Sequence, residues 1–213
     1  MSTHKTYSVR SVRRLLIAAI TGWAVAIAVV AGIIVHIVHE RKQEQRLIQD
    51  ERQREEDTKA RIEALLQEKR MSKLRMLIRE NNPRLSYSEV NAIAYEETTS
   101  AIEKGIDPNL MHALSMQESR WNPNAETWCC EGIRQLHYNV HKDKYGFDSR
   151  EQLKDPIFNI QKGTEFFADL LKMTKGDERL ALQRYYGSTK PEENVHYSNE
   201  VMEKKKYIEK RLS

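Results

Sequence analysis

The sequence has almost no cysteine and no recognisable set of metal ligands. Its two cysteines, Cys129 and Cys130, are neighbours, which excludes a disulfide-stapled scaffold and a four-cysteine zinc module. Neighbouring cysteines can bridge only through a strained ring, so we expect two free thiols. His137 and His141 are four residues apart, but no third ligand accompanies them. A phosphate-binding loop is also missing from the sequence, and we expect no metal and no cofactor.

The C-terminal part of the chain lacks the positive charge that nucleic acids attract. The formal net charge of the chain is +4, but residues 1–83 hold 16 Lys and Arg against 10 Asp and Glu, whereas residues 84–213 hold 19 against 21. A folded nucleic-acid-binding domain is normally basic. We therefore expect no nucleic-acid partner.

Charged side chains are missing from Leu15 to Val35, a run of 21 residues. A helix needs about 20 apolar residues to cross the bilayer core, so we predict one transmembrane helix at residues 15–38, behind a short basic tail at residues 1–14. A cleaved signal peptide is the alternative, but its apolar region is normally only about 7–15 residues long. Basic residues flank the span on both sides, so charge alone does not orient it.

Glycine and proline are missing from residues 33–82, and residues 40–80 interleave 12 Lys and Arg with 10 Asp and Glu. Breaker-free sequence of this composition favours helix. The apolar positions are too sparse to predict a coiled coil. We predict a solvated helical stalk at residues 39–82, with homo-oligomerisation through residues 62–78 as the alternative.

Residues 83–213 are predicted to form a mostly α-helical domain. Ser86 and Glu89 have the spacing of a capping box, and Asp107 before Pro108 is typical of a helix start. No β pattern of useful length is present in the sequence. The expected helices cover residues 86–104, 107–122, 156–174, 178–186 and 198–210.

Glu118 ends the apolar stripe of its predicted helix, seven residues after Met111 and four after Leu114. Apolar neighbours and the negative end of the helix dipole both favour the neutral carboxyl group and raise its pKa. A raised pKa suits a general acid at neutral pH. The alternative is an ordinary glutamate of a last helical turn that faces water.

Several short motifs follow one another at a specific spacing between Gly105 and Gly187. They are GIDPNL at 105–110, QESRWNP at 117–123, GIRQ at 132–135, Asp155-Pro156 with Asn159 and Gly163, and Gly176-Asp177 with LAL at 180–182 and Tyr185. Together they resemble the goose-type-lysozyme-like catalytic domain of lytic transglycosylases, over roughly residues 84–210.

The resemblance implies cleavage of the β-1,4 bond between N-acetylmuramic acid and N-acetylglucosamine in peptidoglycan. It implies that Glu118 protonates the leaving oxygen and then takes the proton of the muramoyl 6-hydroxyl, so that a 1,6-anhydro ring forms without water. By the same resemblance, Ser119 and Gln135 orient Glu118 or the sugar, and Tyr185 hydrogen-bonds near the acid. Trp128 and Tyr186 are the further expected sugar contacts, with core packing as the alternative for Tyr186.

The chain departs from the family's pattern at two positions that bear on the site. Arg134 stands where an apolar residue is usual, so we expect a less buried turn there, and Tyr186 stands where asparagine is usual. Trp121 is expected in the core.

The transglycosylase reaction needs one carboxylate, whereas ordinary glycosidases pair two. Glu126, Glu131 and Asp143 are candidate second carboxylates that we expect to be solvated. If one of them faced Glu118, hydrolysis by a muramidase would be the better account.

The combined interpretation is a single-pass, membrane-anchored lytic transglycosylase of the bacterial inner membrane. Residues 15–38 lie in the lipid bilayer, and the catalytic domain lies in the periplasm with its substrate, the peptidoglycan glycan strands. One alternative is a phage virion or lysis enzyme with the same domain. The other is a non-catalytic peptidoglycan-binding scaffold, for which the residues at 134 and 186 are the motivation.

Overall fold

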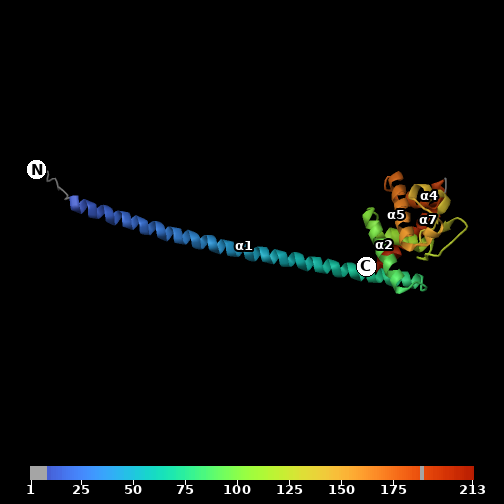
Figure 1. The fold of residues 1–213 in the computed structure, drawn as a ribbon, viewed down its shortest axis with the longest axis horizontal. Helices are drawn as coiled ribbons and strands as arrows, with labels where there is room; N and C mark the ends of the chain where they lie inside the picture. Colours follow the sequence, from blue (N-terminus) through green and yellow to red (C-terminus); the bar gives the residue numbers. More distant parts are fainter. Residues whose placement is uncertain (1–8, 188–189) are drawn as a thin grey trace. The chain divides into compact units, whose positions relative to one another are not determined.

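The computed structural model describes residues 9–187 and 190–213, and part of the predicted tail, residues 1–8, lies outside them. The chain is mostly α-helical, as predicted. Two short 3-10 turns, Glu151–Lys154 and Pro191–Asn194, accompany the longer helices. The helices are α1 (Val9–Asn81), α2 (Tyr87–Glu103), α3 (Pro108–Glu118), α4 (Tyr138–Tyr145), α5 (Pro156–Met173), α6 (Glu178–Tyr185) and α7 (Val195–Leu212) (Figure 1).

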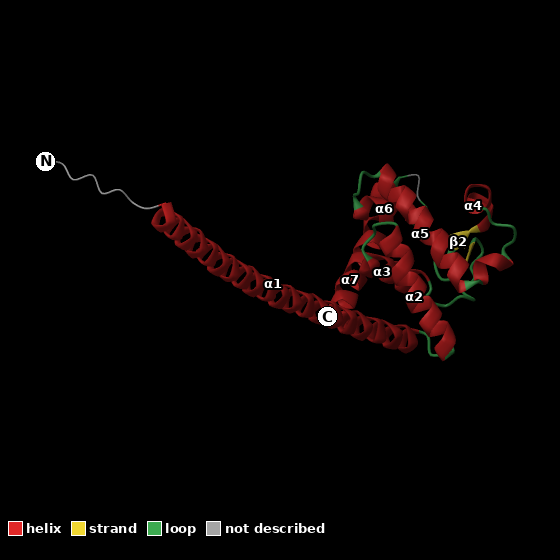
Figure 2. Ribbon diagram, turned by 60° about the vertical axis from the view of Figure 1, so that its left-hand side comes forward, coloured by secondary structure: helices red, strands yellow, loops and turns green. Residues whose placement is uncertain are grey.

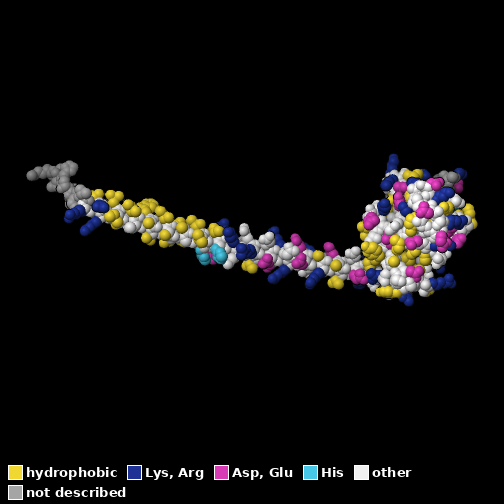
Figure 3. All heavy atoms as spheres, in the orientation of Figure 1, with side chains coloured by type: hydrophobic (Ala, Val, Ile, Leu, Met, Phe, Trp, Pro, Cys, Tyr) yellow, Lys and Arg dark blue, Asp and Glu magenta, His cyan; other side chains and the backbone are white. Residues whose placement is uncertain are grey.

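Helix α1 contains the predicted span and, without a break, the predicted stalk up to Asn81. The chain divides into two compact units, Met1–Glu63 and Ala64–Ser213. Apolar side chains cover the early part of α1, and charged side chains of both signs follow (Figure 3). The most apolar stretch has a mean hydropathy of 2.4 and is unburied, so by length and composition the helix can cross a membrane. A signal sequence near an N-terminus meets the same criterion.

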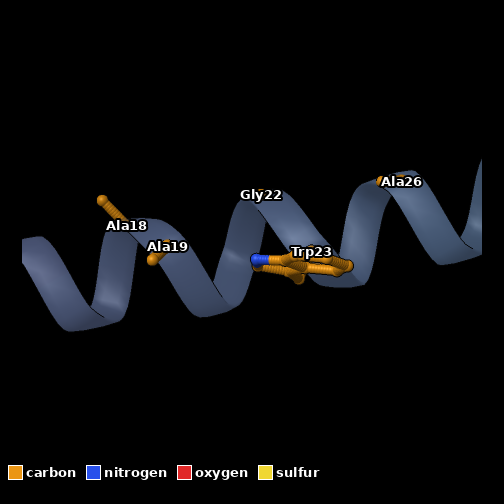
Figure 4. A pocket seen from close by; sticks show the side chains of 5 residues that line it. All are labelled: Ala18, Ala19, Gly22, Trp23 and Ala26. Atoms are coloured by element: carbon orange, nitrogen blue, oxygen red, sulfur yellow. The ribbon is translucent and has the colours of Figure 1, made fainter.

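The apolar stretch carries shallow hollows on its surface, and Figure 4 shows the one that Trp23 lines with four small residues. Its other lining residues are the small ones Ala18, Ala19, Gly22 and Ala26. None of the five side chains is ionisable. The hollow therefore suits hydrocarbon contact rather than chemistry.

The end of α1 belongs to the core of the second unit. Leu74, Leu77 and Ile78 are at most 1% exposed, so the compact unit begins earlier than the predicted boundary at residue 83. Lys73 Nζ donates to the backbone oxygen of Ser213 at 2.6 Å, which ties α1 to the end of α7. Homo-oligomerisation was the alternative for residues 62–78, and this burial removes Leu77 from the apolar side chains that could serve it. The exposed apolar side chains of that segment include Ile62, Leu66 and Met76.

Helix α3 is the most enclosed part of the second unit. Its residues 109–115 are all buried, and it packs against α2 and α7, while α5 packs against α2 and α6 (Figure 2). Asp107 caps α3 by accepting from Asn109 N at 2.9 Å, as predicted. The predicted capping box of α2 is also present, with Ser86 N donating to Glu89 Oε2 at 2.7 Å.

Two helix boundaries and one additional helix differ from the prediction. Helix α3 ends at Glu118 rather than near residue 122, because Arg120 and Trp121 take left-handed backbone angles with φ of 56°. Helix α4 was not predicted, and α7 begins at Val195 rather than at residue 198.

A small antiparallel hairpin between α3 and α4 was also not predicted. Strand β1 (Cys130–Glu131) pairs with β2 (Leu136–His137), with Cys130 opposite His137. The expectation of free thiols was wrong, since Cys129 and Cys130 form a disulfide. Thr127 N donates to Cys130 O at 2.9 Å, and this hydrogen bond closes the tight turn that contains the two bonded cysteines.

Gly132, between the two strands, is predicted to tolerate no side chain. Its φ is +79°, and an added Cβ would lie within 3.0 Å of Leu153 O and Asn159 Nδ2. We expect Gly132→Ala to lower the free energy of unfolding by about 3 kcal/mol or more, from overpacking together with left-handed strain. Gly146→Ala is the control, because its φ is +72° but no atom lies within 4 Å of the added Cβ. Urea denaturation compares them, and equal losses would contradict the steric argument.

Candidate active site

Glu118 is the last residue of α3 and remains partly exposed. Its Oε1 accepts a hydrogen bond from the hydroxyl of Tyr197, a buried residue of α7. Burial raises the pKa of Glu118 to about 7, and the Tyr197 hydrogen bond and the positive charge of Arg134 oppose that rise. A carboxyl group with this pKa exchanges its proton near neutral pH, as acid–base catalysis requires.

Ser119 and Gln135 both hold the loop that follows α3. Ser119 Oγ donates to Ile133 O at 2.8 Å. Gln135 Nε2 donates to Ala125 O at 3.1 Å and to Gly132 O at 3.0 Å. These bonds fix the backbone of the loop beside the end of α3, and a direct role of either side chain toward the sugar stays a prediction.

Tyr185 lies close to the acid but bonds to the backbone. Its hydroxyl donates to Arg134 O at 2.8 Å, and its ring lies 5.0 Å from that of Phe166. Burial, and after it the negative charge of Glu118, raise the pKa of Tyr185. Tyr185 therefore supports the loop and lies within the electrostatic reach of Glu118.

Tyr186 and Trp128 are accessible from solvent. Tyr186 is 55% exposed, and its ring lies 4.8 Å from that of Tyr197. Trp128 is 90% exposed in the turn before β1, edge-on to His137 at 6.4 Å. Core packing therefore does not describe Tyr186, and sugar contact by either ring stays a prediction. Trp121, by contrast, is fully buried, as expected.

The three candidate second carboxylates have different surroundings. Glu126 and Asp143 are exposed, as expected, and Glu126 lies 3.6 Å from Lys154 Nζ. The expectation for Glu131 was wrong: it is 1% exposed on β1 and pairs with Arg150. The guanidinium of Arg150 compensates its charge, which is how a carboxylate can be buried. Two of the candidates are thus engaged with cations.

The expectation of a less buried turn at Arg134 was also wrong, because this residue is 0% exposed. Its Nη2 pairs with Glu97 Oε2 at 3.0 Å, and its Nη1 donates to Met111 O at 2.7 Å. Glu97, on α2, is likewise 0% exposed. A buried partner of opposite charge allows an arginine to replace an apolar residue in a core.

Sequence reasoning missed Tyr197 and Glu97. A signal for Tyr197 was present, since Val201 and Ile208 follow it at helical spacing on the buried face of α7. Glu97 had no such signal, because its partner lies far along the chain.

The sequence model of one protein family, the transglycosylase SLT domain, matches residues 94–208, which is more than half of the chain. The matched region contains Glu118, Arg134 and Tyr197. No curated protein matches the chain.

Proposed function

The chain belongs to the transglycosylase SLT domain family, and on this premise we propose that it cleaves peptidoglycan with Glu118 as its single acid–base residue and leaves 1,6-anhydromuramoyl ends. The family supports peptidoglycan lytic transglycosylase activity in general, with a lysozyme-like catalytic domain. The assignment of Glu118 rests on its place at the end of α3, its pKa of about 7 and its bond to Tyr197.

The proposed reaction uses the carboxyl group of Glu118 twice, first as an acid and then as a base. The protonated carboxyl group donates its proton to the glycosidic oxygen, and the bond from that oxygen to the muramoyl anomeric carbon breaks. The resulting carboxylate keeps the hydrogen bond from Tyr197. It then takes the proton of the 6-hydroxyl as that oxygen attacks the anomeric carbon, which closes the 1,6-anhydro ring and restores the acid. The reaction needs no second carboxylate and consumes no water, whereas hydrolytic glycosidases use a pair of carboxyl groups and a water molecule.

Mass spectrometry of purified peptidoglycan digested by the full chain in detergent tests this proposal. We expect anhydromuramoyl ends, which lack the water that hydrolysis would add. Reducing ends would replace the transglycosylase with a hydrolase. No products from folded protein that still binds glycan would favour the non-catalytic scaffold.

We further propose that α1 anchors the enzyme as a single-pass protein of the bacterial inner membrane, with the catalytic unit in the periplasm. The support is the long apolar run of α1 and the location of peptidoglycan outside that membrane. Long loops and whole domains are translocated largely regardless of flanking charge. Release of the chain from membranes by alkaline extraction would contradict the anchor, and protection of its C-terminal unit from protease in spheroplasts would contradict the orientation.

Loss of the Tyr197 hydroxyl is expected to shift the pH profile upward. Its hydrogen bond favours the ionised form of Glu118, so Tyr197→Phe should raise the pKa of Glu118 above about 7. Hydrogen bonds to charged groups contribute about 1.5–3 kcal/mol, so we expect the basic limb of kcat/KM to move up by about one to two pH units. Tyr207→Phe, at an exposed position of the same helix, is the control. An unmoved limb in Tyr197→Phe would argue against the contact.

A further inference from the structure

A buried ion pair lies behind the catalytic end of α3. Glu97 of α2 and Arg134 of the hairpin loop are both 0% exposed and pair at 3.0 Å. Glu97 also accepts a hydrogen bond from Ser115, and its Oε2 lies 3.3 Å from His112 Nδ1. A buried ion pair adds little net stability over an apolar pair of similar volume. Its presence beside a proposed acid therefore calls for a functional account.

Arg134 and its neighbour Ile133 hold α3 on both sides of Glu118. The Arg134 Nη1 donates to Met111 O at 2.7 Å, about two helical turns before Glu118. The Ile133 carbonyl accepts from Ser119 Oγ at 2.8 Å, directly after Glu118. The loop thus brackets the segment of α3 that presents the acid.

The backbone of Arg134 extends the same bracket to two more helices. Its carbonyl accepts from the Tyr185 hydroxyl of α6 at 2.8 Å, and its N–H donates to Asn159 Oδ1 of α5 at 2.7 Å. The aliphatic stem lies so close to Gly163 that an added Cβ there would come within 3.0 Å of it. One residue therefore connects α2, α3, α5 and α6 immediately behind Glu118.

We propose that the Arg134–Glu97 pair is the positioning element for Glu118: the guanidinium fixes the last two turns of α3, and Glu97 weakens the effect of its positive charge on the acid. This inference rests on the proposed function of Glu118. Neither residue touches the glycan; both act through the placement and the proton affinity of the acid.

The charges around the site give the two halves of the pair opposite effects. Tyr197 of α7, Tyr185 of α6 and Arg134 of the loop face Glu118, and the charge of Arg134 lowers the pKa of Glu118. Removing Glu97 leaves that cation without its anionic partner, so the acid should lose its proton at lower pH. Removing Arg134 deletes the cation, so the acid should keep its proton to higher pH.

Glu97→Gln, Arg134→Met and the double variant of the full chain test the pair. For Glu97→Gln we expect the basic limb of kcat/KM to move down by about one pH unit, with about a tenfold loss at pH 8. For Arg134→Met we expect the limb to move up. In the double variant both charges are gone, so the basic limb of kcat/KM should return close to its wild-type position. Its kcat at the pH optimum should still be about tenfold below wild type with KM unchanged, because the methionine at position 134 cannot donate to Met111 O.

The titration of Glu118 can also be followed without activity. Thermal unfolding of each variant with and without Glu118→Gln, from pH 5 to pH 9, isolates the contribution of this one carboxyl group.

Shifts of opposite sign in the pKa of Glu118 in the two single variants would support the pair even if the wild type released no glycan, a result that would overturn only the proposed function. A folded double variant with wild-type kcat would overturn the positioning role. Basic limbs of kcat/KM that move in the same direction in the two single variants, or not at all, would overturn the electrostatic role of the pair. If a single variant does not fold, the double variant still decides the positioning role.

Discussion

Replacing Glu118 with glutamine is expected to lower the rate of glycan cleavage by about 100- to 10,000-fold. General acid–base groups contribute factors of this size, and glutamine can neither give nor take the proton. The amide keeps the size of the side chain and can still accept from Tyr197, so the fold should persist. Release of anhydromuramoyl products from peptidoglycan measures the loss.

Asp143→Asn is the matched control for this experiment, because it removes the charge of an exposed carboxylate on α4. We expect it to leave the rate unchanged. A near-wild-type rate for Glu118→Gln would remove Glu118 as the acid. A large loss for Asp143→Asn would instead point to a second carboxylate and a hydrolytic reaction.

Glu118→Gln is also expected to stabilise the fold at alkaline pH. The pKa of Glu118 is about 7 in the folded chain against 4.5 ordinarily, so the folded state binds this proton more tightly than the unfolded state. Stability is therefore fully present below pH 4.5 and falls as pH rises to about 7. Glu118→Gln escapes this loss, so we expect it to be more stable than wild type at pH 8 by up to about 3 kcal/mol, with little difference at pH 4. Thermal unfolding at the two pH values measures this, and equal stabilities at pH 8 would contradict the raised pKa.

A fragment that starts at Asn82 is expected not to fold, whereas one that starts at Ala64 should. The shorter fragment lacks Leu74, Leu77 and Ile78, which are at most 1% exposed in the core. Truncating one such side chain to alanine costs about 2–5 kcal/mol, and small domains are stable by only about 5–15 kcal/mol in total. Removing all three with their backbone should therefore exceed the stability that remains.

Circular dichroism with urea titration distinguishes the two fragments. We expect a cooperative transition for residues 64–213, the compact unit of the structure, and none for residues 82–213. Equal transition midpoints would show that the end of α1 adds nothing to the core. The choice also matters for assays, because the shorter fragment would report on an unfolded chain.

Helix starts could be predicted because their signals are local. Ser86, Asp107 and Pro156 each act within one helical turn, and each begins a helix in the structure. The hairpin was missed because strands of two residues leave too little periodicity to detect. Helix α4 was missed because no side chain caps its start, whereas Asp177 caps the equally short α6.

The placement of candidate site residues was harder to predict, because it depends on partners remote in the chain. Arg134 was expected to loosen its turn, but Glu97, 37 residues earlier, compensates it in the core. Tyr197 reaches Glu118 across 79 residues. A motif identifies the acid, but the groups that set its proton affinity come from other helices.

If the catalytic unit lies in the periplasm, as we propose, the bond between Cys129 and Cys130 can report on its export. Thiols in a reducing cytosol stay reduced, whereas oxidising compartments form disulfides. Newly made chains that still wait inside the cell should therefore react with an alkylating reagent at both cysteines, and exported chains should not react until a reductant is added. Comparing the two labelled fractions after a pulse of synthesis would measure how quickly the C-terminal unit crosses the membrane, and equal labelling without a reductant at all times would contradict the proposed periplasmic location.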